Sequence, residues 1–294
     1  MSSPVLIAAP VAARHNVTRH WLGIGLLVAS LLALYAPVFA RLIAQWWSDP
    51  NYAYGFLVPP FCAWLVFERR HRLRALAVQP RAAGLLLVFA ALGILLVGKL
   101  GSELLLTRAS FLLMLAGLIV TLRGWRWLRA LAFPLAFLGF MIPWPTLIYN
   151  LATIPLKNIA TRTGVGLLAW TGLPILREGN LIILPAAMLD VVAACSGIRS
   201  LLALLALATA YGYLLEPSRW RRALLIAAMP PLAVLSNAVR IALTILLTFR
   251  FGDAASHGIW HMLTGLQVFA VALIGLVLLQ RALHVRPEPR RVHV

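Results

Sequence analysis

Long apolar runs separated by short basic segments constrain this chain more than any other feature. The first run, residues 21–40, has twenty residues, and about 20 apolar residues suffice for a helix to cross a hydrocarbon core of about 30 Å. Hydrophobic residues make up 62% of the chain and charged residues only 12%, a composition that excludes an ordinary water-soluble domain. We therefore predict an all-α polytopic membrane protein.

Eight transmembrane helices are expected. Their apolar runs cover residues 21–40, 56–67, 82–97, 104–122, 130–148, 195–215, 223–249 and 261–279. Prolines interrupt the fifth run near its outer end and also fall inside the seventh, where they remove backbone donors. Before the sixth run we predict an interfacial amphipathic helix near residues 150–170 and a short hairpin that turns at Gly179-Asn180.

The same runs define one domain. Residues 21–281 form a single transmembrane domain between a cytoplasmic segment, residues 1–20, and a basic cytoplasmic tail, residues 282–294. The first run could instead be a signal peptide, because Ala40 ends it as a small residue ends a cleavage site. Its length, and the presence of Tyr35 and Pro37 before that site, favour a retained helix.

The basic residues indicate the orientation of the chain. They total 26 against 8 acidic residues, but they form short clusters between apolar runs, which is typical of membrane topology and not of nucleic-acid binding. With both termini in the cytoplasm, 17 of them lie on the cytoplasmic side, as the positive-inside rule requires. Seven lie on the outer side: Arg41, Lys99, Arg108, Lys157, Arg162, Arg177 and Arg250.

The last two arginines, Arg199 and Arg240, lie inside spans, where a charge costs about 2.5–3.5 kcal/mol and indicates a functional site. Cys195 opens the sixth run and His261 opens the eighth, both on the outer side, and Arg240 lies ten residues before Arg250. A thiolate is a nucleophile, a histidine can protonate a leaving amine, and an arginine can stabilise an oxyanion. These three residues therefore predict acyl transfer from a peptide bond near the outer leaflet.

Residues beside these three have open roles. Ser196 and Gly197 are small and leave room for a substrate backbone, and Asn237 lies one turn before Arg240. Arg199 shares a helical face with Cys195, and is either a second cation of the site or a packing charge. His257 competes with His261 as the base.

The second cysteine, Cys62, lies in an apolar run and is expected to be a small buried side chain without a catalytic role. No cofactor and no metal site are predicted.

Several segments resemble the exosortase and archaeosortase family. Three of them carry the candidate residues: CSGIRSL at residues 195–201, SNAVRIALT at 236–244 and GIWHMLTGLQVF at 258–269. Two weaker ones are WWSDPNYAYGFLVP at 46–59 and EGNLIILP at 178–185. The likeness extends in unbroken order from about residue 46 to residue 280.

This resemblance implies a membrane-embedded cysteine peptidase or transpeptidase of a bacterial inner membrane, with its active site near the periplasmic face. Its partners would be membrane lipids and exported proteins that end in a Pro-Glu-Pro type motif, a transmembrane helix and a basic tail. The motifs assign Cys195 as nucleophile, Arg240 as the arginine and His261, in preference to His257, as the histidine. Many relatives have an acidic residue shortly before the cysteine, where this chain leaves only Asp190.

Two other functions stay open from the sequence. A transporter or export scaffold would use Arg199 and Arg240 to bind an anionic solute, with the proline-broken runs as its discontinuous helices. Neither a repeat nor an intramembrane acid supports this alternative. The thiol could also serve simple hydrolysis or acyl transfer from lipid, because the sequence does not identify the acceptor.

Overall fold

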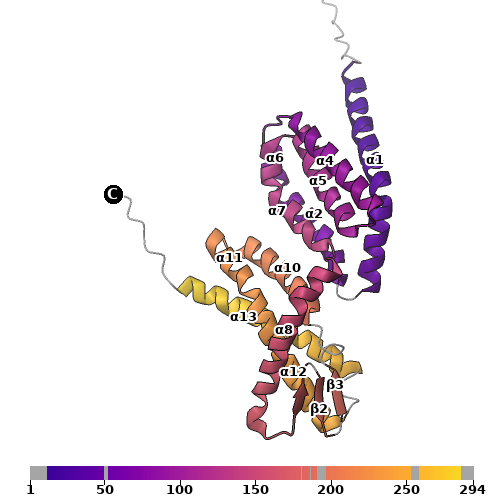
Figure 1. Ribbon diagram of the computed structural model, residues 1–294. Coiled ribbons are helices and arrows are strands. Elements are labelled where there is room, and N and C mark those ends of the chain that lie inside the picture. The colour runs from indigo at the N-terminus through magenta and orange to yellow at the C-terminus, as the bar shows by residue number, and fades with distance from the viewer. Residues whose placement is uncertain are drawn as a thin grey trace, which may run out of the picture.

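Helices form most of the chain in the computed structural model, which describes residues 12–49, 52–179, 181–185, 187–190, 197–252 and 258–285 (Figure 1). The first half contains α1 (Ala12–Ser48), η1 (Ala53–Leu57), α2 (Val58–Glu68), α3 (Arg70–Arg74), α4 (Ala83–Leu100), α5 (Leu104–Leu122), α6 (Trp125–Ala130), α7 (Ala132–Phe137) and η2 (Leu138–Met141). The second half contains α8 (Thr146–Leu167), η3 (Ala169–Thr171), β1 (Leu176–Glu178), β2 (Leu181–Leu184), β3 (Ala187–Asp190), α10 (Gly197–Leu215), α11 (Arg219–Ala227), α12 (Met229–Phe251) and α13 (Gly258–Val285).

The apolar helices follow the predicted runs in order. Within the described residues, five are long and apolar enough to cross a membrane: Gly25–Ser48, Ala83–Leu100, Leu104–Leu122, Arg219–Phe251 and Met262–His284. Three shorter apolar helices, Ala53–Glu68, Ala132–Met141 and Leu201–Leu215, lie at the remaining predicted positions. The chain is thus an all-α polytopic membrane protein, and the number of eight crossings stays a prediction.

Two predicted runs differ from the helices observed. The fifth run was expected to reach about residue 148 with a break at residues 143–145, but the α-helix already stops at Phe137 and the 3₁₀ turn η2 ends at Met141. Residues 146–148 belong instead to α8, which begins after Pro145. The seventh run was expected to be one span with two prolines inside it. The helix instead breaks at Ala228, so that Pro230 and Pro231 stand in the first turn of a separate helix, α12. Proline is tolerated there because the first N–H groups of a helix have no intrahelical acceptor.

The predicted hairpin is confirmed, and it belongs to a larger sheet. β1 pairs with β2 in antiparallel register, with Glu178 opposite Leu181, and Gly179 adopts a φ of 64° in the turn. A third strand, β3, which the sequence analysis did not predict, pairs with β2. α8 covers most of the region in which an interfacial helix was predicted.

Close packing of α1, α4 and α5 forms the N-terminal bundle. A Cβ atom on Gly98 would lie 2.9 Å from the backbone nitrogen of Thr107, and one on Gly117 would lie 2.8 Å from that of Val88. These contacts need glycine, because small residues let helix backbones approach where lipid supplies no hydrophobic driving force. The α4–α5 pair is therefore a rigid support for its connecting turn.

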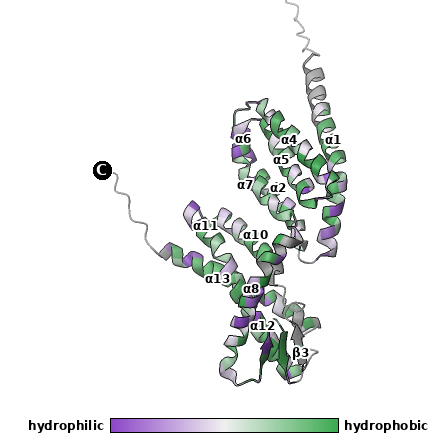
Figure 2. Ribbon diagram, in the orientation of Figure 1, coloured by the Kyte–Doolittle hydropathy of each residue, from purple (hydrophilic) through white to green (hydrophobic). Residues whose placement is uncertain are grey.

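The second group of helices surrounds α12. α8 leads from the N-terminal bundle to the sheet and packs along α12, and α10, α11 and α13 pack on the other sides of α12 (Figure 1). Hydrophilic residues gather at α6, at the lower end of α1, near α8 and α12, and at the end of α11 that follows α10, whereas most of the other helical segments are apolar (Figure 2). Exposed side chains such as Leu26, Leu86 and Leu266 fit a lipid-facing surface.

Candidate active site

A stripe of buried polar side chains runs along α12. Its members are spaced by four residues and share one helical face: Ser236, Arg240, Thr244 and Thr248. Arg240 is only 7% exposed. The Ser236 hydroxyl donates to the carbonyl of Leu232 (2.8 Å) and the Thr244 hydroxyl to that of Arg240 (2.9 Å). These two hydroxyls bond to their own helix, whereas the buried Thr248 hydroxyl has no hydrogen-bond partner among the described residues. Asn237 and Arg240 carry the side-chain N–H donors of this region.

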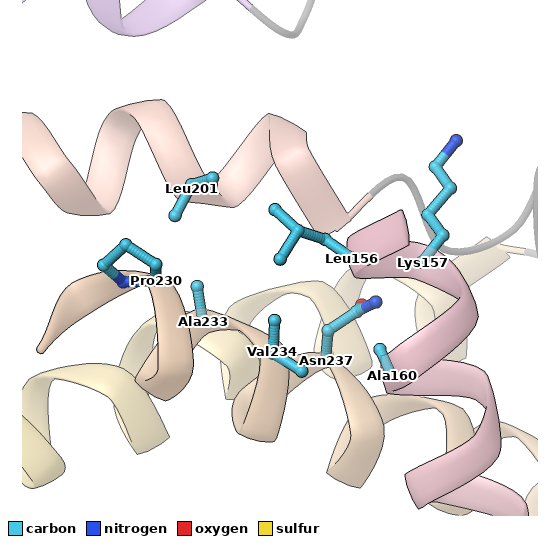
Figure 3. Close-up of a pocket in the computed structure, with 8 residues that line it drawn as sticks. All are labelled: Leu156, Lys157, Ala160, Leu201, Pro230, Ala233, Val234 and Asn237. Atoms are coloured by element: carbon cyan, nitrogen blue, oxygen red, sulfur yellow. The ribbon is translucent and has the colours of Figure 1, made fainter. Parts of the chain in front are cut away.

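Asn237 faces a narrow pocket between α8, α10 and α12 (Figure 3). The pocket volume is about 10 Å³, the space that one water molecule needs. Asn237 is 2% exposed, and its Oδ1 accepts no hydrogen bond from the described residues. The amide therefore has an unused acceptor below the start of α10, and Leu156 of α8 lies between them (Figure 3).

Small residues hold α8 against the helix that carries Arg240. Ala160 and Gly164 follow the small-xxx-small pattern of close membrane helix contacts, and both are buried. A Cβ atom on Gly164 would lie 2.8 Å from the carbonyl oxygen of Ala238 and 3.0 Å from Cβ of Ile241. The α8 backbone thus lies in contact with α12 at the turn that contains Arg240.

The sheet covers the same part of α12. Ile182 and Leu184 of β2 are buried in one apolar cluster with Ala160 of α8 and with Ile241 and Ile245 of α12. Ile241 follows Arg240 directly. The sheet therefore packs beside Arg240.

α13 runs antiparallel to α12. Two contacts fix their relative level: a Cβ atom on Gly275 would lie 2.7 Å from Leu232, and the rings of Phe251 and Trp260 stack with centroids 5.6 Å apart. His261, in the first turn of α13, is therefore level with the last turn of α12. Measured along the α12 axis, the His261 backbone therefore lies about nine residues, or roughly 13 Å, beyond Arg240 toward the C-terminal end of α12.

The predicted site residues differ in what the structure describes. Arg240 and Asn237 are buried on α12, and their roles in a reaction stay predictions. Gly197 and Arg199 lie in the first turn of α10. Cys195, Ser196 and His257 lie outside the described residues, so the role of Arg199 and the choice between His257 and His261 stay predictions.

Cys62 is a buried residue of α2. It is 5% exposed within the apolar cluster of α2 and α7, and its Sγ lies 3.3 Å from the carbonyl oxygen of Pro134, to which it can donate. The prediction of a small buried side chain is confirmed.

Some residues near the site were missed by the sequence analysis. The hydroxyls of Thr244 and Thr248 follow from the four-residue polar spacing after Ser236, which the sequence displays. Leu156, Lys157 and Ala160 line the pocket from α8, and their proximity to α12 has no sequence signal. The described residues contain no group of three or more His, Cys, Asp or Glu side chains that could hold a metal ion.

Comparison with known proteins gives one result. A family model described as transmembrane exosortase matches residues 46–278. No curated protein and no solved structure matches the chain. The matched range begins at Trp46 and includes α12, the sheet and most of α13.

Proposed function

Since this chain belongs to the transmembrane exosortase family, we propose that it is a cysteine transpeptidase that cleaves C-terminal sorting signals of exported proteins. Cys195 is the nucleophile, Arg240 stabilises the oxyanion, and His261 transfers the proton. The observation that carries this proposal is the buried Arg240 on α12. The two elements that precede and follow Cys195 in the chain, β3 and α10, both pack against α12.

Chain connectivity supports Cys195 as the nucleophile. β3 ends at Asp190 and α10 begins at Gly197, and both elements contact α12. Leu201 of α10 lies across the narrow pocket from Pro230 and Ala233 (Figure 3). Because α10 continues from Leu201 back to Gly197, its N-terminus approaches the level of Asn237, one turn before Arg240. N–H groups at a helix start favour a thiolate in this region.

The burial of Arg240 supports its role. A guanidinium inside a membrane span is costly and is retained for function. In a site with little water, its interaction with a developing oxyanion is stronger than in water. Asn237, one turn earlier, adds an amide that can orient the substrate backbone.

The proposed reaction has two steps, formation of a thioester and its attack by a second nucleophile, and each proton given up by one group is taken up by another. The Cys195 thiolate attacks the scissile carbonyl, the C–N bond breaks, and the His261 imidazolium gives its proton to the leaving amine. The product is a thioester. An incoming nucleophile then attacks this thioester and gives its proton to His261 as the thiolate leaves. The His261 backbone lies about nine residues nearer the end of α12 than Arg240, and in this proposal the substrate carbonyl binds between these two levels.

The substrate is proposed to arrive laterally from the membrane. Its sorting helix enters between lipid and protein, so that the Pro-Glu-Pro type motif reaches the periplasmic end of the site. The sheet of β1, β2 and β3 covers α12 beside Arg240, and in this proposal it restricts water and shapes the entrance. The enzyme would act in a bacterial inner membrane.

The direct test co-expresses the protein with a substrate that bears a Pro-Glu-Pro tail and follows its processing. Cys195→Ala should abolish processing, whereas Cys62→Ala, a matched control for loss of a thiol, should retain it. Normal processing by Cys195→Ala would refute the assignment. Mass spectrometry of the new C-terminus distinguishes hydrolysis from transfer to an amine or a lipid.

Arg240→Lys separates this proposal from solute transport. A lysine keeps the charge but loses the planar fork of donors. Processing should fall at least tenfold, because an ammonium cannot offer two parallel N–H groups to the oxyanion. A transport site that recognises charge alone would retain its activity.

A further inference from the structure

Three of the seven basic residues predicted on the outer side gather in one pocket. Arg41 of α1, Lys99 of α4 and Arg108 of α5 line a cavity of about 290 Å³. Arg41 is distant in the sequence from Lys99 and Arg108, which flank the short turn between α4 and α5. The positive-inside rule disfavours each of the three on this side of a membrane. Their convergence therefore points to a ligand with negative charge.

Arg108 is the buried member of this group. It is 3% exposed, and its Nη2 donates a hydrogen bond of 2.8 Å to Oε1 of Gln45. Gln45 is neutral, so this bond orients the guanidinium without cancelling its charge. A buried charge is costly unless it is paired, and within the described part of the chain no carboxylate forms an ion pair with Arg108.

The wall of the pocket is built for close approach. Gly98 lines it at the point where α4 and α5 touch, and the connecting turn contributes Ser102, whose φ of 55° lies in the left-handed region. The nearest acid along this turn is Glu103, which forms no ion pair among the described residues. The side chains lining the pocket thus carry three positive charges and no negative one.

The depth of these cations matches that of lipid headgroups. Arg41 lies seven residues before the end of α1, Lys99 is one residue from the end of α4, and Arg108 is four residues after the start of α5. At 1.5 Å per residue, all lie within roughly 10 Å of their helix ends. The polar headgroup regions add about 5–8 Å on each side of the hydrocarbon core. Pro37 and Leu104 provide apolar wall beside the cations.

We propose that the pocket between α1, α4 and α5 binds a phosphate group, as carried by an anionic lipid of the outer leaflet. Arg108 and Lys99 contact the phosphate oxygens, Arg41 closes the exposed side, and Ser102 offers a hydroxyl donor. Arginine suits this ligand because its planar fork matches two phosphate oxygens. This binding site is separate from the reaction proposed at Cys195 and does not depend on it.

Native mass spectrometry of the full-length protein in detergent tests the proposal. The protein is titrated with dioleoyl phosphatidylglycerol and, separately, with dioleoyl phosphatidylcholine. The wild type should prefer the anionic lipid. Arg41→Gln/Lys99→Gln removes two exposed cations without disturbing buried Arg108, and should weaken phosphatidylglycerol binding by about 25-fold, since each basic residue contributes about fivefold.

The matched control is Arg162→Gln/Arg250→Gln, which removes two exposed basic residues from the same predicted side but outside the pocket. It should change binding by less than about threefold. An equal loss in both double variants, or no lipid preference in the wild type, would overturn the proposal. In a second arm, inorganic phosphate should displace the bound lipid more strongly than chloride at the same ionic strength. Equal displacement by chloride would also overturn it, because the pocket would then recognise charge alone.

Discussion

Gly164→Ala tests the contact between α8 and α12 that supports the candidate site. The added Cβ atom would lie 2.8 Å from the carbonyl oxygen of Ala238 and 3.0 Å from Cβ of Ile241. Favourable carbon contacts begin near 3.5 Å, so the helices must separate by about 0.5–1 Å. Both clashing atoms belong to the backbone or to Cβ, so no side-chain rotation relieves the contact.

Two opposing effects set the magnitude. Alanine is a better helix former than glycine by up to about 1 kcal/mol. Overpacking of a close contact costs about 1–3 kcal/mol, and here the clash is with backbone. We therefore expect a net loss of about 1 kcal/mol in the free energy of unfolding, with a fall of a few degrees in Tm.

Gly166→Ala is the control on the same helix. No atom lies within 4 Å of the Cβ position at Gly166, so this variant should have unchanged or slightly higher stability. Thermal unfolding in detergent, followed by tryptophan fluorescence, compares the two variants. Gly164→Ala should also reduce substrate processing about tenfold, because a shift below 1 Å in a catalytic site is costly. A Gly164→Ala protein as stable and active as Gly166→Ala would refute the close contact.

Two further predictions concern the N-terminal bundle and the thiols. Trp46 Nε1 donates to the carbonyl of Met141 at 3.0 Å, so Trp46→Phe should lower the free energy of unfolding by about 1–3 kcal/mol. Trp47 is 85% exposed, so Trp47→Phe should change the free energy of unfolding by less than about 0.5 kcal/mol. Equal Tm values for the two variants would contradict this prediction. Cys62→Ala leaves only Cys195, and a maleimide should label this variant in the folded protein. Cys195→Ala leaves only Cys62, which is buried, so this variant should not be labelled. Labelling of Cys195→Ala at the wild-type rate would contradict the burial of Cys62.

The sequence by itself determined the class of fold and the order of the apolar helices. In lipid the backbone must form its hydrogen bonds internally, so a long apolar run folds into a helix. Residues 104–122 accordingly form α5 with the predicted bounds. Local turn chemistry likewise located the hairpin at Gly179. The cost of charge in a membrane identified Arg240, which is buried on α12.

The ends of helices were less predictable from the sequence, because local preferences compete there with contacts to distant parts of the chain. Pro143 and Pro145 indicated a break, but the helix had already ended at Met141, where the chain supplies the carbonyl that Trp46 binds from α1. The prolines of the seventh run start α12 and do not interrupt it. A pattern read along the chain does not include such distant partners.

Tertiary structure alone decided which residues meet. Three features join segments separated by dozens of residues: the contact of Gly164 with Ala238, the Asn237 pocket under α10 and the approach of Arg41 to the α4–α5 pair that carries Lys99 and Arg108. Hydrophobic periodicity shows that a helix has a buried face, but not which helix will cover that face. In a membrane this choice depends on close backbone approach at small residues and on polar contacts between helices, and both exist only once the chain has packed.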